Sequence, residues 1–287
     1  LSGIGDVSIH DNVWYKRNFE YKKIKKLRTI LHFEAVDYET TVYINGKPVG
    51  KNTGGSVSFS FDITDFLNED GNQELTVYVF DPSIDAYISR GKQSWRENPF
   101  ECFYDRTTGI WQTVWIEEVH ASGLEDLKIH TDIDKKQVKF DVYAKDSYPK
   151  EVLIEILYDG KILHSKQEKF KNKACLTFDL DKLNLWTPET PNLYDVKLTL
   201  IKDGFIIDSV GSYFGMRKIS IDGNKILLNN KPYYLRLVLD QGYYPDGLLS
   251  YPTEEDLLND IKLSKQMGFN GCRKHEKIEA QRWMYYA

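Results

Sequence analysis

The first part of the chain carries the pattern of short β-strands. Residues 57–61 alternate strictly between apolar side chains and serine, as expected of a half-buried strand. Other β-rich runs lie at residues 14–21, 29–36, 41–44, 74–80 and 110–119. The third of these ends at Asn45-Gly46, the strongest short hairpin signal. We predict a β domain over residues 1–120, interrupted between residues 81 and 108 by a long connection of a kind that is often functional.

The next segment repeats short strands more regularly. Seven apolar-rich runs occupy residues 124–131, 138–144, 152–158, 162–170, 175–180, 194–200 and 205–213. Asp159-Gly160 and Asp203-Gly204 are turn signals that join two of these runs to their successors. This spacing predicts an immunoglobulin-like β-sandwich over residues 121–214. The Cys…Trp…Cys pattern of antibody domains is missing, so the likeness is one of architecture.

Residues 215–287 follow an α/β pattern. A hairpin is predicted at 219–228, and the almost continuous apolar run at 233–239 is typical of a strand buried on both faces. Thr253 begins a predicted helix that extends to Met267, and residues 269–273 form a second strand. This β-α-β order predicts the opening of a parallel α/β domain, whereas a complete eight-stranded barrel needs ~250 residues.

Composition and charge narrow the classes of function. The 287-residue chain is 41% hydrophobic and 28% charged, as in globular proteins, and its net charge of −5 provides no general attraction for nucleic acid or anionic membranes. No apolar run approaches the ~18–20 residues of a membrane span. The three cysteines are odd in number and far apart, so we expect free thiols, which suit a reducing compartment and slightly favour the cytoplasm while leaving the localisation open.

Known cofactor and metal motifs do not occur in the sequence. It contains no phosphate-binding loop, dinucleotide-binding glycine motif, serine nucleophile elbow or zinc-protease helix motif. The six histidines are scattered without the spacing of metal ligands. We therefore predict no metal and no cofactor.

Two polar segments follow the two predicted strands of the α/β part. Asp240, Gln241 and Tyr243 come directly after the first strand, and parallel α/β folds bind ligands beyond the carboxyl ends of their strands. A sugar ring offers C–H faces to an aromatic ring and hydroxyls to carboxylate and amide groups, so this segment is a candidate sugar site. The alternative is a turn that packs on itself. Arg273 and His275 lie at the end of the second strand. This segment is either part of a functional site or the solvent-exposed start of a helix.

Several motifs in order along the chain resemble glycoside hydrolase family 2, the group of β-galactosidases, β-glucuronidases and β-mannosidases. The motifs are Val42-Tyr-Ile-Asn-Gly46, Phe61-Asp-Ile-Thr-Asp65, Thr107-Thr-Gly-Ile-Trp-Gln-Thr-Val-Trp115, Leu185-Trp-Thr-Pro-Glu-Thr-Pro-Asn-Leu-Tyr194, Phe214-Gly-Met-Arg217 and Phe269-Asn-Gly-Cys-Arg273. Each is modest alone, and together they cover nearly the whole chain.

The resemblance implies a mainly β fold with three domains. These are a jelly-roll sugar-binding β-sandwich (1–120), an immunoglobulin-like β-sandwich (121–214) and the first part of a (β/α)8 TIM barrel (215–287). Family members hydrolyse β-linked glycosides with retention, using two glutamates from later barrel strands. We therefore expect no catalytic residue in this chain, both glutamates being beyond Ala287. The expected role is that of a fragment, inactive by itself, of a retaining, β-galactosidase-like glycosidase.

The resemblance also implies roles for single residues. Arg273 matches the arginine of the second barrel strand, beneath the sugar pocket, and Asp240 and Gln241 lie where related members contact substrate. Independently of the resemblance, the loop that carries Trp95 is a candidate to reach over the barrel mouth, the alternative being that Trp95 fills a core or an interface. His275 stands where many members have serine, and Glu276 where they have histidine, which puts the role of that histidine in question. The candidate substrate-binding residues are Asp240, Gln241, Tyr243, Arg273, His275 and Trp95.

The expected partner is a β-linked saccharide, with no nucleic acid and no membrane, and a homo-oligomer of the full-length protein is left open. The rival hypothesis is a non-catalytic carbohydrate-binding or adhesion module whose terminal α/β piece is a vestige. Coding sequence beyond Ala287 with an Asn-Glu pair and a second barrel glutamate would favour the enzyme.

Overall fold

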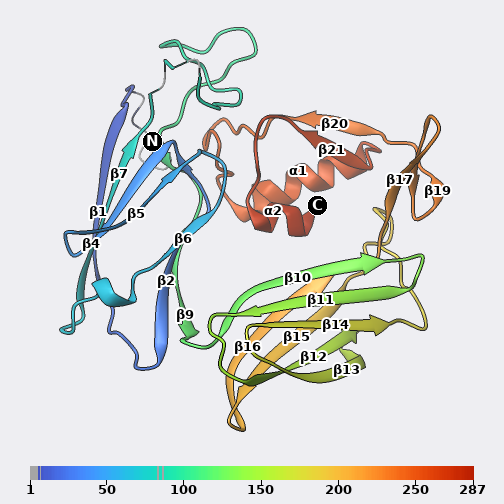
Figure 1. Ribbon diagram of the computed structural model, residues 1–287. Coiled ribbons are helices and arrows are strands. Elements are labelled where there is room, and N and C mark those ends of the chain that lie inside the picture. Colours follow the sequence, from blue (N-terminus) through green and yellow to red (C-terminus); the bar gives the residue numbers. More distant parts are fainter. Residues whose placement is uncertain (1–5, 7, 83, 86) are drawn as a thin grey trace. The chain divides into compact units, whose positions relative to one another are not determined.

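The computed structural model describes residue 6 and residues 8–82, 84–85 and 87–287 (Figure 1). It is dominated by β-strands, and its contacts divide the chain into two compact units. One unit combines the chain up to Glu118 with Arg236–Ala287, and the other is Val119–Leu235. None of the described helices is long and apolar enough to cross a membrane.

The N-terminal part of the first unit consists of two main sheets. The first has the order β1-β7-β4-β5, with β1 (Asn12–Glu20), β7 (Asn72–Phe80), β4 (Glu39–Ile44) and β5 (Lys47–Thr53). The second has the order β6-β2-β9, with β6 (Phe59–Asp62), β2 (Leu27–Phe33) and β9 (Val114–His120). Smaller elements are the pair β3 (Val36–Asp37) and β8 (Gly109–Ile110), and the 3-10 helix η1 (Thr64–Phe66). The predicted sandwich is confirmed.

The core of this sandwich follows from period-2 alternation, because alternate side chains of a strand face opposite sides. Val42 and Ile44 of β4, and Val79 of β7, are fully buried between the sheets. The predicted hairpin at Asn45-Gly46 is present between β4 and β5. Both residues have positive φ, as a two-residue turn of this type requires.

The long connection after β7 contains no helix and no named strand among its described residues, yet it is packed on the sandwich. Gln93 is buried, its Nε2 donates to Asp37 Oδ2 (2.7 Å), and its Oε1 accepts from the Thr107 amide (2.6 Å). Thr108 Oγ1 donates to the buried carboxylate of Asp81 (2.8 Å). These bonds pair buried polar groups that would otherwise be costly.

The second unit is a sandwich with all seven predicted strands. One sheet is β10 (Leu124–Asp132), β11 (Gln137–Ala144) and β14 (Lys173–Asp179). The other, in the order β13-β12-β15-β16, is β13 (Lys161–Phe170), β12 (Lys150–Tyr158), β15 (Tyr194–Lys202) and β16 (Phe205–Phe214). Phe140, Ile154 and Leu198, which come from both sheets, are fully buried in one core.

A small antiparallel sheet forms the C-terminal part of the second unit. It consists of β17 (Ile219–Asp222), β18 (Lys225–Leu228) and β19 (Lys231–Pro232), in this order. The predicted hairpin at 219–228 is therefore present, and its contacts group it with the preceding sandwich. The division into three domains at residues 120 and 214 stays a prediction.

The C-terminal part of the first unit is a β-α-β segment followed by a short helix. Its elements are β20 (Leu237–Asp240), α1 (Glu254–Gln266), β21 (Gly271–Lys274) and α2 (Gln281–Tyr286). β20 and β21 are parallel, as predicted. The expectation of a strand over 233–239 buried on both faces is wrong. The strand begins at Leu237, and both Leu237 (42%) and Leu239 (54%) are exposed, since β21 is its one neighbour among the described strands.

Candidate functional site

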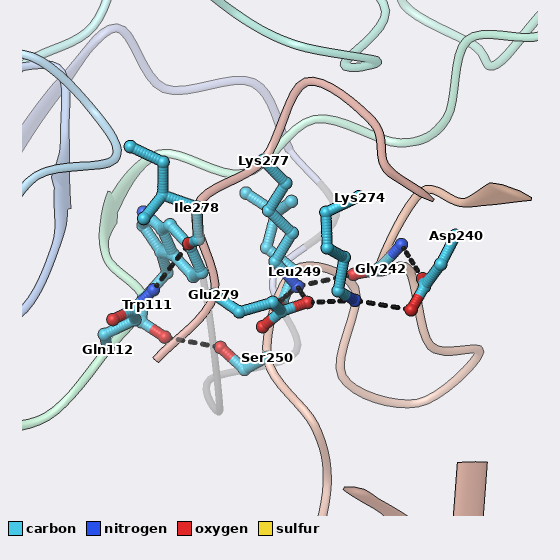
Figure 2. A network of polar contacts seen from close by, with 10 residues as sticks. All are labelled: Trp111, Gln112, Asp240, Gly242, Leu249, Ser250, Lys274, Lys277, Ile278 and Glu279. Atoms are coloured by element: carbon cyan, nitrogen blue, oxygen red, sulfur yellow. Dashed lines mark hydrogen bonds and ion pairs between the residues drawn. The ribbon is translucent and has the colours of Figure 1, made fainter. Parts of the chain in front are cut away.

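The candidate site lies where β20 and β21 end, next to each other. Because the strands are parallel and in register, their last residues, Asp240 and Lys274, are direct partners. Lys274 Nζ lies 2.6 Å from Asp240 Oδ2, and Asp240 Oδ1 accepts from the Gly242 amide (2.8 Å) (Figure 2). The carboxylate that the sequence predicted at this edge is therefore oriented by a cation and a backbone donor.

A buried network of charges continues from Lys274 into the loop after β21. Glu279 Oε1 lies 2.6 Å from Lys274 Nζ and 2.9 Å from Lys277 Nζ (Figure 2). The side chains of Lys277 and Glu279 are each only 2% exposed. Burial lowers the pKa of the Lys277 ammonium, and the charge of Glu279 opposes that shift. Two lysines and two carboxylates (Asp240 and Glu279) thus balance one another within this edge.

Lys277 also fixes the loop that follows β20. Its Nζ donates to the carbonyl oxygens of Gly242 and Leu249, each at 2.6 Å. Gly242 has a positive φ, and a side chain there would meet the Lys277 Nζ and Glu279 carboxylate within 3 Å. The glycine is therefore required both by its backbone conformation and by the close approach of the two charged groups.

Gln241 and Tyr243 contact the long connection of the sandwich. The hydroxyl of Tyr104 donates to Gln241 Oε1 (2.5 Å), and the rings of Tyr104 and Tyr243 are stacked with centroids 4.4 Å apart. Burial, together with the charge of Asp37, raises the pKa of the Tyr243 phenol above its ordinary value. Its hydroxyl is buried and has no hydrogen-bond partner within the described part of the chain. The predicted aromatic and amide groups are thus together, but Tyr243 already carries a ring on one of its faces.

Arg273 and His275 are placed differently from Asp240. Arg273 is exposed and points to the opposite face of β21 from Lys274, as the alternation of a strand requires. The His275 amide donates to the Asp240 carbonyl (2.9 Å), which extends the strand pairing by one residue. His275 Nδ1 lies 3.5 Å from Glu276 Oε1. The structure therefore brings the backbone of His275 to the candidate site and leaves the Arg273 side chain out of the buried network.

Trp95 belongs to an aromatic cluster within its own loop. Its ring packs edge-on against Phe100 (5.0 Å) and Phe103 (4.7 Å), and it is 39% exposed. Tyr104, the next residue after Phe103, is the residue that contacts Gln241. Trp95 is thus linked to the candidate site through its loop, and no direct contact between its ring and Asp240, Gln241 or Tyr243 is present.

A small cavity of about 180 Å³ adjoins the network on the side of the sandwich. It is lined by Glu34, Trp111, Gln112, Thr113, Leu249, Ser250, Tyr251, Glu279 and Ala280. Ser250 Oγ donates to the Trp111 carbonyl (2.5 Å), and Gln112 Nε2 donates to the Ile278 carbonyl (3.3 Å) (Figure 2). Sandwich and α/β segment therefore share polar contacts within one unit.

The candidate site predicted from the sequence did not include Lys274, Lys277 or Glu279, although all three lie within six residues of Arg273. A signal was present, since these charged residues lie at the end of a partly buried strand and just after it. Which of them turn inward depends on the loop conformation, and Glu276 between them has a positive φ that redirects the chain. Among the described residues, no group of three or more His, Cys, Asp or Glu side chains is arranged to hold a metal ion.

Two protein-family models match the chain in succession. The model described as glycosyl hydrolases family 2, sugar binding domain, matches residues 6–118, and the model described as glycosyl hydrolases family 2 matches residues 122–217. The two matches together span most of the chain and correspond to its two sandwiches.

Curated relatives cover the chain almost from end to end. It is similar to a β-galactosidase of Clostridium acetobutylicum, with 29% identity over 277 residues that cover 94% of this chain and 29% of that protein. A putative β-glucuronidase of Formosa agariphila is 28% identical over 270 residues, which cover 91% of this chain and 31% of that protein. The chain thus spans about three tenths of the length of these relatives.

Solved structures have the same arrangement of elements. A Bacteroides uniformis β-glucuronidase matches with a TM-score of 0.81 and 26% identity, over 96% of this chain and 35% of that chain. A putative β-galactosidase from Bacteroides fragilis matches with a TM-score of 0.82 over 99% of this chain and 44% of that chain. At 20% identity, the second likeness concerns the fold alone.

Proposed function

Because the chain belongs to glycosyl hydrolase family 2, we propose that it is the non-catalytic part of a retaining β-glycosidase, with two sandwiches and the first part of a (β/α)8 barrel. The observation that carries this proposal is the order of the parts. Two sandwiches matched by the family models are followed by parallel strands that end at Asp240 and Lys274. Relatives with this order bear the names β-galactosidase and β-glucuronidase.

In the proposed reaction, one carboxylate attacks the anomeric carbon and a carboxylic acid protonates the leaving oxygen. Water then hydrolyses the glycosyl-enzyme, which gives retention. We assign both carboxyl groups to barrel strands beyond Ala287. The carboxylates at the present edge are unsuited to either role, since Glu279 is buried between two lysines and Asp240 is paired with Lys274.

The role proposed for this chain is to bind and orient the sugar. Gln241 Oε1 accepts from Tyr104, so the Gln241 amide nitrogen is the group left to donate to a sugar hydroxyl. Asp240 keeps an acceptor carboxylate at the same edge, 30% exposed and held in one orientation by Lys274 and Gly242. Arg273, His275 and Trp95 remain proposed pocket residues, of which this chain brings only the backbone of His275 to Asp240.

The charge balance of the edge favours a neutral sugar, and we propose a β-galactoside. Lys274 and Lys277 are both paired with carboxylates, so neither is an uncompensated cation for the carboxylate of a uronic acid, and the exposed Arg273 points to the opposite face of β21. A pocket built on this edge therefore gains little by accepting a glucuronide in place of a neutral hexoside.

The test is hydrolysis of aryl β-galactoside, β-glucuronide, β-mannoside and β-glucoside by two proteins, the 287-residue chain and a protein extended through a complete barrel. We expect turnover of the galactoside by the extended protein and none by the chain alone. Turnover by the chain alone would contradict the assignment of the catalytic pair. Absence of turnover by the extended protein on every substrate would favour the rival carbohydrate-binding or adhesion module.

A matched pair of variants in the extended protein tests the binding role of Gln241. Loss of one hydrogen bond to the sugar is expected to lower kcat/KM by roughly fivefold in Gln241→Ala. The control is Gln266→Ala, which changes an exposed glutamine at the end of α1 and should leave kcat/KM unchanged. Equal kinetics for both variants would remove Gln241 from the pocket.

A further inference from the structure

Three aromatic rings lie together on the outer face of the sheet β1-β7-β4-β5. They belong to Trp14 of β1, Tyr43 of β4 and Tyr78 of β7. The Trp14 ring centroid is 4.6 Å from that of Tyr78 and 6.1 Å from that of Tyr43. Trp14 is 62% exposed, which is unusual for the largest side chain, because a tryptophan usually covers most of its surface in a core or an interface.

The register of the sheet explains why these rings face outward. Trp14 pairs with Tyr78, and Tyr78 pairs with Thr41 of β4. Tyr43 lies two residues after Thr41 on the same strand, so the side chains of Trp14, Tyr43 and Tyr78 point to the same side of the sheet. The residues next to them along the strands, such as Val42 and Val79, are fully buried in the sandwich core. The three rings therefore contribute nothing to that core, and their grouping asks for another explanation.

Polar groups of both hydrogen-bonding types surround the rings. Tyr78 donates its hydroxyl proton to Asn12 Oδ1 (2.6 Å), and Lys16 and Glu74 form an ion pair at 2.7 Å. Further members of this face near the rings, by strand register, are Phe80, Glu39, Thr41, Lys51 and Thr76. The charges next to the rings cancel, with two lysines against two glutamates, and a third glutamate, Glu20, lies at the far end of β1. A strongly charged ligand therefore has no counter-charge here, whereas a neutral ligand rich in hydroxyls finds donors and acceptors.

We propose that this face, defined by Trp14, Tyr43 and Tyr78, is a binding site for a neutral β-linked oligosaccharide. The C–H faces of a pyranose are apolar with slight positive charge, and they pack on the negative face of an aromatic ring, while the hydroxyls at the rim of the sugar reach the flanking side chains. Residues 6–118 match a family model described as a sugar binding domain, but that description names no residues. The structure assigns this role to one face of one sheet.

This site shares no residue with the edge at Asp240 and Lys274. The inference therefore does not depend on hydrolysis, and it holds equally for a catalytic and for a non-catalytic parent. A protein partner is the competing occupant, since Trp and Tyr are also enriched in protein interfaces. We favour the sugar because the apolar area is limited to the three rings and the half-buried Phe80 within a polar frame, whereas a stable protein interface has a larger apolar centre.

The experiment is native affinity electrophoresis of the 287-residue chain in gels that contain soluble β-linked polysaccharides, namely β-1,4-galactan, xylan and mixed-linkage β-glucan. We expect retardation by at least one of them, and none by soluble starch, whose linkages are α. Trp14→Ala should weaken the apparent affinity by about tenfold, because it removes the most exposed ring. Tyr43→Ala should also weaken it.

A matched tryptophan variant separates this face from other aromatic residues. Trp115→Ala removes a 37% exposed ring of β9, in the other sheet. It should keep the retardation, with the folding of every variant checked by circular dichroism and thermal unfolding. The proposal is overturned if no β-linked polysaccharide retards the parent chain, or if Trp14→Ala is retarded as strongly as the parent. Sedimentation showing self-association that Trp14→Ala abolishes, without any retardation, would assign the face to protein contacts instead.

Discussion

At the scale of single residues, buried charged side chains of this protein stabilise the conformation of loops. Lys277 is nearly inaccessible, and it satisfies its ammonium group with two carbonyl oxygens and Glu279. A buried ion pair of this kind contributes little against an apolar replacement of both partners, but loss of one partner leaves a charge uncompensated, at a cost of about 3–5 kcal/mol. The conformation of the loop after β20 therefore depends on one lysine, which lies beyond the end of β21.

Asp37 gives the first unit a pH-dependent stability. Burial, and in addition the charge of Asp81, raise the pKa of the Asp37 carboxyl from 3.8 to about 7. Between these values the folded state holds a proton that the unfolded chain has released, so the stabilisation is complete below pH 3.8 and is lost as the pH rises through about 7. We expect Asp37→Asn to flatten the fall in stability across this window, as measured by urea unfolding at several pH values.

The control for Asp37 is Asp65→Asn, since the Asp65 side chain is 93% exposed. That variant should retain the pH dependence of the parent. Part of the slope should also survive in Asp37→Asn, because burial raises the pKa of Asp81 in the same direction. Identical slopes for Asp37→Asn and the parent chain would show that the Asp37 carboxyl does not carry the effect.

At the scale of elements, helix α1 begins where its local sequence dictates. Thr253 Oγ1 accepts from the Asp256 amide (3.2 Å), and Asp256 Oδ2 accepts in return from the Thr253 amide (3.0 Å). This capping box satisfies two backbone donors that the first turn cannot pair internally. Glu254, Glu255 and Asp256 also place negative charge at the positive end of the helix dipole.

We expect Thr253→Ala to lower the free energy of unfolding of the first unit by about 1 kcal/mol, because the side-chain acceptor at the N-cap is lost. Thr253→Ser keeps the hydroxyl and should restore most of that loss. Urea unfolding followed by circular dichroism measures both variants. If the serine variant is as unstable as the alanine variant, the cap hydrogen bond is not the source of the effect.

At the scale of the whole molecule, the second unit has a core of its own. Nineteen buried residues, most of them from the two sheets, form this core, so Val119–Leu235 should fold by itself with one cooperative thermal transition. In that isolated unit, Phe140→Ala should lose roughly 3–5 kcal/mol of stability, because Phe140 is fully buried. Phe205→Ala is the matched control, since Phe205 is 74% exposed. A broad transition without cooperativity would contradict the independence of this unit.

The first unit is built from the N-terminal sandwich and the C-terminal α/β segment. Its α/β segment packs on the sandwich through a small cluster of Ala35, Trp111 and Leu249, with Tyr243 against it. Two parallel strands and two helices could not bury such a cluster alone. The candidate site therefore owes its position to the sandwich as much as to its own strands.

From the residues alone one could predict all seven strands of the second sandwich, most strands of the first, the Asn45-Gly46 turn, and the start of α1 at Thr253. These features are local, since period-2 alternation, a two-residue turn and a helix cap depend on residues only a few positions apart. The sequence also placed Asp240 and Gln241 at the carboxyl end of a strand, because a β-α-β order aligns parallel strands.

Which groups meet at that edge depends on long-range packing. Tyr104 and Gln241 are 137 residues apart, and nothing near either residue indicates the other. The burial of Lys277 and Glu279 depends on the packing of their loop. The exposure of Arg273 follows from the sheet in which β21 lies, because β20 is its one neighbour among the described strands. The outward group of Trp14, Tyr43 and Tyr78 likewise needs the register of three strands, because alternation within one strand does not say which residues its neighbours place beside them.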